Sequence, residues 1–119
     1  MAVLRARLRQ IVVDCAAPDR LARFWAALLG GTPVVRDAGW AYLDAPGTAR
    51  LAFQRVPEEK AGKNRLHLDL AVEDVARARA AAVRLGARPV GATVTDAQGA
   101  FQVMRDPEGN EFCFVSAAC

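Results

Sequence analysis

The clearest pattern in the chain is the alternation of apolar and polar residues in the segment NRLHLDLAVED, residues 64–74. Leucine or valine fills every second position, while His67, the only histidine of the chain, and Asp69 fill two of the positions between. Such a period of two is typical of a β-strand. It predicts a strand with one apolar face and a second face that carries an imidazole and a carboxylate.

A longer pattern occurs twice along the chain. Residues 10–34 (QIVVDCAAPDRLARFWAALLGGTPV) run from a β-branched strand into a helix, then through a glycine stop into a new strand. Residues 67–90 (HLDLAVEDVARARAAAVRLGARPV) repeat this order at nearly the same length. Asp19 and Asp74 stand where the two helices should begin, so we expect both to be N-terminal caps.

The segments that follow are also repeated. Residues 43–53 (LDAPGTARLAF) align without a gap with residues 104–114 (MRDPEGNEFCF), and both read as strand, Pro/Gly turn and strand. Each half of the chain is therefore predicted to be a β-α-β-β-β module. The strands are expected near residues 4–13, 33–37, 40–44 and 50–56, and again near residues 65–72, 88–95, 100–105 and 111–115.

The repeat predicts one domain built from two modules. We assign residues 1–56 to module one, the polar segment 57–64 (PEEKAGKN) to a linker and residues 65–119 to module two. A unit of this size cannot cover its own sheet, so the two modules should pack together. The length of 119 residues and the hydrophobic fraction of 53% suffice for one modest core.

Composition argues against several classes of protein. The net charge is +3, but the basic residues are spread out and mixed with acids, which argues against a nucleic-acid partner. No apolar run approaches the roughly 20 residues of a membrane helix, and the start MAVLRARLRQ lacks the apolar core of a secretory signal. We therefore expect a cytoplasmic protein with no membrane partner. Cys15, Cys113 and Cys119 form no CxxC pair and are expected to be free thiols.

The duplication, together with DRLARFWAALLG (residues 19–30) and RDPEGNEFCF (residues 105–114), resembles the vicinal oxygen chelate superfamily. That superfamily includes glyoxalases, bleomycin-resistance proteins and extradiol dioxygenases, and the chain looks most like bacterial glyoxalase-like domain proteins. The resemblance covers essentially the whole chain. It implies an α+β fold in which two βαβββ modules form a curved eight-stranded cleft with the helices outside.

The resemblance also indicates where a metal would bind. Metal-dependent members place one ligand in the first strand and one in the last strand of each module, and these positions fall on Gln10, Ala52, His67 and Cys113. Such members usually have glutamates in the last strands, whereas Ala52 has no donor atom and Cys113 offers a soft sulfur. We therefore expect no standard divalent-metal site and no cofactor.

Strand alternation and the resemblance together define a candidate ligand site. Side chains that should point into the cleft are those of Gln10, Gln54, His67 and Cys113. Trp40 and Tyr42 share a face of one short strand and are candidates for an aromatic wall, although alternation alone leaves open which face they occupy. Phe24 and Trp25, on the first helix, are expected in the core or at a contact between the modules.

His67 and Asp69 are the candidate catalytic residues. Asp69 could orient the His67 ring or act as a base, and an ion pair with Arg65 or Arg105 is the plainer alternative. Cys113 lies in the apolar run FCF, where a cysteine is usually an inert hydrophobe rather than a nucleophile.

These expectations favour a homodimeric protein that binds or sequesters a small organic ligand in its cleft. One alternative is a metal-dependent lyase, isomerase or dioxygenase-type enzyme with a reduced ligand set of Gln10, His67 and perhaps Cys113. A second alternative is a non-catalytic interaction module whose cleft is filled by its own side chains.

Overall fold

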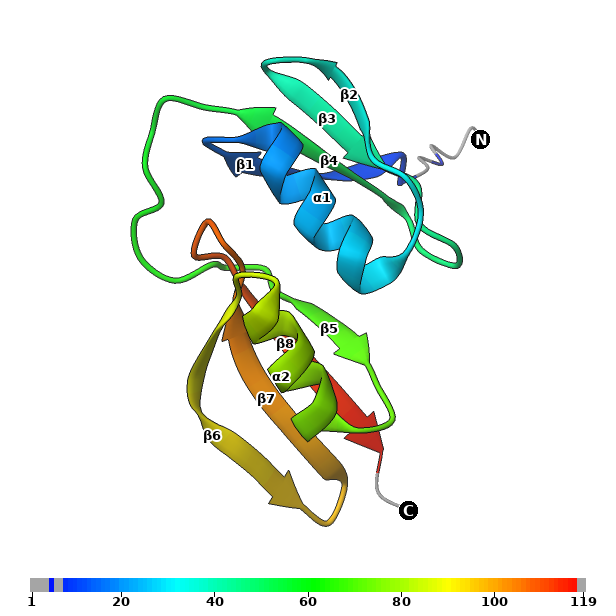
Figure 1. The fold of residues 1–119 in the computed structure, drawn as a ribbon, viewed down its shortest axis with the longest axis vertical. Coiled ribbons are helices and arrows are strands. Elements are labelled where there is room, and N and C mark those ends of the chain that lie inside the picture. Colours follow the sequence, from blue (N-terminus) through cyan, green and yellow to red (C-terminus); the bar gives the residue numbers. More distant parts are fainter. Residues whose placement is uncertain (1–4, 6–7, 118–119) are drawn as a thin grey trace. The chain divides into compact units, whose positions relative to one another are not determined.

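A computed structural model of the protein describes residues 5 and 8–117. The chain divides into two compact units, Met1–Glu59 and Lys60–Cys119; in Figure 1 the first runs in colour from blue to green and the second from green to red. The division falls inside the segment 57–64 that the sequence suggests as a linker.

Unit one is a four-stranded mixed sheet with one helix on it. Its elements are β1 (Gln10–Cys15), α1 (Pro18–Leu29), β2 (Val34–Asp37), β3 (Trp40–Leu43) and β4 (Arg50–Arg55). The strand order is β1-β4-β3-β2, with β1 parallel to β4 and the other neighbours antiparallel. The helix α1 packs against β3 and β4 (Figure 1).

Unit two repeats this topology. Its elements are β5 (Leu68–Ala71), α2 (Val75–Arg84), β6 (Arg88–Asp96), β7 (Gly99–Arg105) and β8 (Glu111–Ala117). The strand order is β5-β8-β7-β6, and β5 is again the one strand parallel to its neighbour. The predicted α+β fold with two βαβββ modules is confirmed.

The core of each unit lies between its helix and one face of its sheet. In unit one, Leu21, Phe24 and Trp25 of α1 are almost fully buried, as are Leu43 and Phe53 of the sheet. The Phe24 and Trp25 rings meet edge to face with 5.6 Å between their centroids, which confirms both as core residues. The other face of the sheet carries polar and aromatic side chains together with the exposed Val12 and Val34.

Unit two has a smaller helix and a core that relies on its strands. Val75 and Ala82 are the buried residues of α2, and Phe112 and Phe114 of β8 pack edge to face at 5.4 Å beneath it. Met104 of β7 is fully buried. Because these residues cover the helix side of the sheet, the alternate positions of β7 and β8 point to the opposite face.

The helix caps agree with the sequence at only one of the two helices. Asp74 is confirmed as the cap of α2, since its carboxylate accepts a hydrogen bond of 3.0 Å from the backbone N–H of Arg77. The prediction for Asp19 is wrong, because α1 begins at Pro18 and Ala17 is its N-cap. The fixed φ of proline suits the first helical position, so the helix starts before Asp19.

The first strand is shorter at its beginning than predicted. It was expected near residues 4–13 but runs from Gln10 to Cys15, and residues 4, 6 and 7 lie outside the described residues. The β1–β4 pairing begins at Gln10 with Arg50 and ends at Cys15 with Arg55. Because β1 pairs only with the six residues of β4, the length of β4 limits β1.

A bulge interrupts β6. Val90 pairs with Val103 and Val94 pairs with Phe101, so three β6 residues stand opposite Gln102 alone. The Gln102 side chain is fully buried there. Its Nε2 donates to the carbonyl oxygens of Gly91 (3.1 Å) and Val103 (2.9 Å), and its Oε1 accepts from the Thr93 hydroxyl at 2.7 Å. The bond to Gly91 gives a partner to a backbone carbonyl within the bulge, and the bond from Thr93 holds a bulge side chain to the same amide.

Candidate functional site

The face of the unit-two sheet that lies opposite α2 carries the chemically active side chains. Asp69 of β5 pairs with Cys113 of β8, and Cys113 pairs in turn with Val103 of β7. Residues paired in this way point to the same face of a sheet. The alternation predicted for His67, Asp69 and Cys113 therefore holds, although His67 lies one residue before β5 begins.

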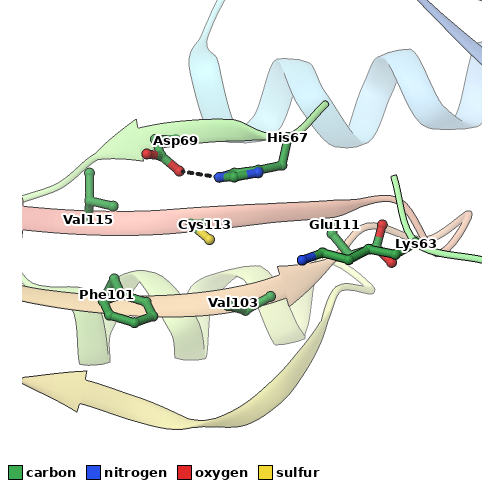
Figure 2. A pocket seen from close by; sticks show the side chains of 8 residues that line it. All are labelled: Lys63, His67, Asp69, Phe101, Val103, Glu111, Cys113 and Val115. Carbon is green, nitrogen blue, oxygen red and sulfur yellow. Dashed lines mark ion pairs between the residues drawn. The ribbon is translucent and has the colours of Figure 1, made fainter. Parts of the chain in front are cut away.

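This face contains a hollow of about 360 Å³, which is near the lower end of the volumes typical of small-molecule sites. Figure 2 shows its lining residues on β5, β7, β8 and the segment before β5. The lining consists of Lys63, His67, Asp69, Phe101, Val103, Glu111, Cys113 and Val115. All eight belong to unit two, so the hollow is complete within that unit.

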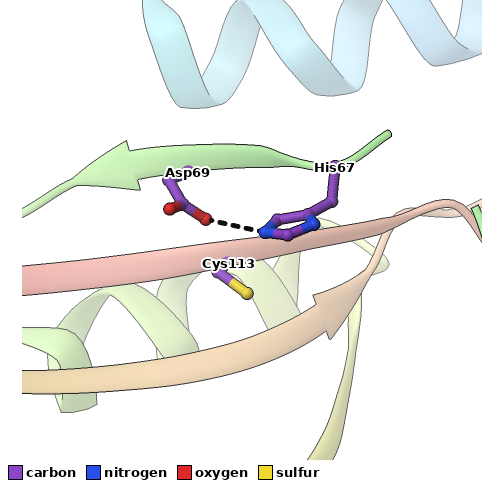
Figure 3. A group of neighbouring side chains, drawn as sticks. All are labelled: His67, Asp69 and Cys113. Carbon is purple, nitrogen blue, oxygen red and sulfur yellow. Dashed lines mark ion pairs between the residues drawn. The ribbon is translucent and has the colours of Figure 1, made fainter. Parts of the chain in front are cut away.

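His67 and Asp69 are in direct contact. The distance from His67 Nε2 to Asp69 Oδ1 is 3.3 Å, and both side chains are about half exposed (Figure 3). Asp69 thus pairs with His67, while the Nε of Arg105 lies 3.9 Å from a Glu111 oxygen. In a neutral ring this contact places the proton on Nε2 and leaves Nδ1 as a hydrogen-bond acceptor.

Cys113 lies beside this pair. Its Sγ, an imidazole nitrogen of His67 and a carboxylate oxygen of Asp69 are all within 4.8 Å of one another (Figure 3). Burial raises the pKa of the Cys113 thiol, the charge of Asp69 raises it further, and the ammonium of Lys63 acts in the opposite direction. The thiol is therefore protonated at neutral pH, which makes it a poor nucleophile.

The Glu111 side chain fixes residues 60–64, the segment that carries Lys63. Its side chain is only 7% exposed, and it accepts hydrogen bonds from Lys60 Nζ at 3.4 Å and from the backbone N–H of Asn64 at 3.1 Å. Burial alone would raise the pKa of Glu111, but these two groups and its own backbone N–H together hold the pKa below its ordinary value. The ionised carboxylate therefore holds residues 60–64 against β8.

Sequence reasoning missed Lys63, Glu111, Phe101 and Val103 as parts of the site. Phe101 and Val103 could have been found, because they alternate with the core residues of β7 and therefore occupy the face of Cys113. Lys63 carried no such signal. It belongs to the polar segment between the modules, and its position depends on the contacts of Glu111.

The remaining predicted site residues lie in unit one, on the sheet face opposite α1. Gln54 pairs with Trp40, and Tyr42 pairs with Ala52, so the register places both aromatic rings on the face of Gln54. Gln10 lies on this face too, but at the other end of β1. It pairs with Arg50, whereas Gln54 pairs with Asp14, four residues further along β1.

Both aromatic rings of this face are covered by guanidinium groups. Arg36 stands 5.1 Å above the Trp40 ring, and Arg50 stands 4.0 Å above the Tyr42 ring. Arg50 also donates two hydrogen bonds of 2.8 Å to Asp44, and these bonds hold the pKa of the Asp44 carboxyl below its ordinary value. Arg50 therefore fixes the Tyr42 ring through a paired, ordered side chain.

The family's four metal-ligand positions do not fit a standard divalent-metal centre. Ala52 is fully buried and has no donor atom, and Cys113 offers a soft sulfur where the family usually has a carboxylate. Among the described residues, the group of donors close enough to hold an ion is instead His67, Asp69 and Cys113. Two of these three, His67 and Asp69, already contact each other at 3.3 Å.

The repeated βαβββ order defines this chain as an α+β protein of paired modules, with a hollow on the sheet face of the second. The family model described as "Glyoxalase-like domain" matches residues 10–115, and the chain belongs to this family, within the vicinal oxygen chelate superfamily.

No curated protein matches the sequence. In the described part of the chain, no helix is long and apolar enough to span a membrane.

Solved structures share the fold at low sequence identity. A glyoxalase/bleomycin resistance protein/dioxygenase family enzyme from Burkholderia phytofirmans PsJN is 19% identical with a TM-score of 0.82, over 95% of this chain and 100% of that one. A glyoxalase-related enzyme from Fulvimarina pelagi is 18% identical with a TM-score of 0.73, over 92% and 87%. The bleomycin-binding protein of Streptomyces verticillus, solved with copper(II)-bleomycin, is 18% identical with a TM-score of 0.64, over 98% and 100%.

Proposed function

We propose that the protein binds a small organic ligand in the hollow of unit two and does so without the family's four-ligand metal centre or another cofactor. The observation that carries this proposal is the hollow itself. It has an apolar floor of Phe101, Val103 and Val115 and a few polar groups at its edges. An apolar surface with a small number of placed polar groups is what an organic ligand requires.

The bleomycin-binding protein supports the same function by analogy. That protein, which shares the fold, was solved with a complexed small molecule. In the present chain, His67 would be the polar anchor, because its ring is oriented by Asp69 and its side chain is 51% exposed. The pair could also accept a proton from a bound ligand at Nδ1, with Asp69 stabilising the charged ring.

The test is a titration of the ¹⁵N-labelled full chain with a panel of small aromatic and aliphatic compounds. We expect chemical-shift changes centred on Val103, Cys113 and Val115, and weaker binding after His67→Ala. Leu66→Ala is the matched control, because Leu66 is the exposed neighbour of His67 and does not line the hollow. Equal affinities of the two variants for every bound compound, or shifts confined to unit one, would exclude this site.

The three-donor group favours a second candidate function. A metal-dependent lyase, isomerase or dioxygenase-type enzyme with a reduced ligand set could use His67, Asp69 and Cys113 in place of the family positions. Metal analysis of protein purified without added metal separates the two candidates. We expect no stoichiometric zinc, nickel or iron. A stoichiometric ion in the wild type that is absent from Cys113→Ser would favour the metal-dependent enzyme.

We further propose that the protein does not isomerise the hemithioacetal of methylglyoxal and glutathione. The glutamates that glyoxalases place in the last strands have no counterpart at Ala52 or Cys113. The family resemblance also favours a homodimer, and the dispersed basic residues argue against a nucleic-acid partner. Light scattering at micromolar concentration tests the dimer, and a monomeric mass would contradict it.

A further inference from the structure

The charged groups around the hollow are unequally compensated. Glu111 is bound by Lys60 and by the backbone of Asn64, and Asp69 is bound by His67. Lys63 has no ion-pair partner within the described part of the chain. The ammonium of Lys63 is therefore the one charged group without a side-chain partner among the described side chains that line the hollow.

The position of this ammonium makes it part of the hollow. In Figure 2 the Lys63 side chain extends from the segment before β5 across the sheet, and its nitrogen points to the space between Val103 and Cys113. Its charge is close enough to influence the Cys113 thiol. The backbone that carries it is held by the hydrogen bond from the neighbouring Asn64 N–H to Glu111.

We propose that the hollow selects a small monocarboxylate, whose charged group pairs with Lys63 and whose apolar body lies on Phe101, Val103 and Val115. This inference rests on the proposed ligand-binding function and adds the charge of the ligand. One ammonium compensates one carboxylate, whereas a phosphate dianion would need further donors. A metal cation is disfavoured, because the ammonium repels it.

The experiment compares three probes with the same ring system: 1-naphthoate, 1-naphthylmethanol and 1-naphthylmethylamine. Each is titrated into the ¹⁵N-labelled full chain, and the dissociation constant is taken from shifts of Val103, Cys113 and Val115. The wild type should bind the anion most tightly. Lys63→Gln should weaken naphthoate binding about tenfold and leave naphthylmethanol within twofold, because an ionised hydrogen-bond partner contributes roughly that factor.

Arg65→Gln is the matched control for charge. It removes the same positive charge two residues away, on a side chain that is exposed and does not line the hollow. A smaller loss of naphthoate affinity in Arg65→Gln than in Lys63→Gln supports direct contact. The ¹⁵N spectrum of each variant shows whether unit two is still folded.

The outcomes separate this inference from the proposed function. Probes that bind at the hollow regardless of their charge, or a naphthoate affinity that Lys63→Gln leaves unchanged, would refute the carboxylate but keep the binding site. Tightest binding of the amine would refute it as well. If no probe shifts residues of the hollow, the proposed function and the carboxylate both fail.

Discussion

Substituting Glu111 by glutamine tests whether one ionised carboxylate holds the segment 60–64 against β8. The change keeps the size and one acceptor oxygen of the side chain and removes its charge. In the native protein, Glu111 accepts from Lys60 Nζ at 3.4 Å and from the Asn64 N–H at 3.1 Å, and its side chain is 7% exposed. The variant therefore isolates the contribution of the charge.

The expected loss at pH 7 is about 1–2 kcal/mol in the free energy of unfolding. Hydrogen bonds to charged groups contribute roughly 1.5–3 kcal/mol each, but glutamine can still accept one of the two bonds. The bond from Lys60 is also long, and the Lys60 side chain is 25% exposed, which reduces its share.

The loss should depend on pH. The pKa of Glu111 in the folded protein lies below its ordinary value of 4.5, so ionisation stabilises the fold. This contribution is complete above about pH 4.5 and disappears as the pH falls through the folded value. Wild type and Glu111→Gln should therefore differ fully at pH 7 and converge at low pH.

The measurement must report on unit two. Trp25 and Trp40 both belong to unit one, so tryptophan fluorescence follows the other part of the chain. Amide hydrogen exchange of β8 is suitable, because β8 lies in unit two. Glu73→Gln is the control, because it removes the same charge from an exposed position. Equal stabilities of the two variants at pH 7, or a loss that persists below the folded pKa, would refute the reasoning.

Three further predictions concern single positions. Asp74→Ala should destabilise the protein by about 1 kcal/mol in urea unfolding, and Asp19→Ala by clearly less, because only Asp74 caps a helix. Gly31→Ala should destabilise the protein by about 1–3 kcal/mol and by more than Gly47→Ala. Both glycines have a positive φ (+84° and +74°), but only at Gly31 would the added Cβ lie 2.8 Å from a backbone oxygen, so equal losses would contradict this. Cys113 should react with iodoacetamide more slowly than free cysteine at pH 8, because its pKa is raised from 9.0. The reaction rate of Cys113 should increase as the pH passes 9, and peptide mass spectrometry measures this rate.

The sequence predicted the sheet faces because strand alternation is a local property. His67 and Asp69 are two residues apart, so any extended backbone places them on one side. Their approach to Cys113 required the β5–β8 pairing, which the repeat and the family resemblance supplied. The same local rule could not choose a face for Trp40 and Tyr42. Their face is set by the register of β3 against β4.

The cationic side of the candidate site could not be predicted from local patterns. Lys63 lies in a segment without apolar periodicity, and its position depends on a bond between residues 47 positions apart in the chain. The start of β1 was unpredictable for a related reason. The apolar–basic alternation continues before Gln10, but β4 offers no partner there, and Leu8 is left 74% exposed.

The β6 bulge has a consequence for the behaviour of the protein at high concentration. β6 is an edge strand, and nearly all of its residues are exposed, including Val90 and Val94. A straight apolar edge invites a strand from another molecule to pair with it and begin aggregation. The extra residues that Gln102 holds in place bend the edge between the two valines, so an incoming strand finds no continuous row of backbone partners. The buried amide of Gln102 thus protects the folded protein against intermolecular β-sheet growth.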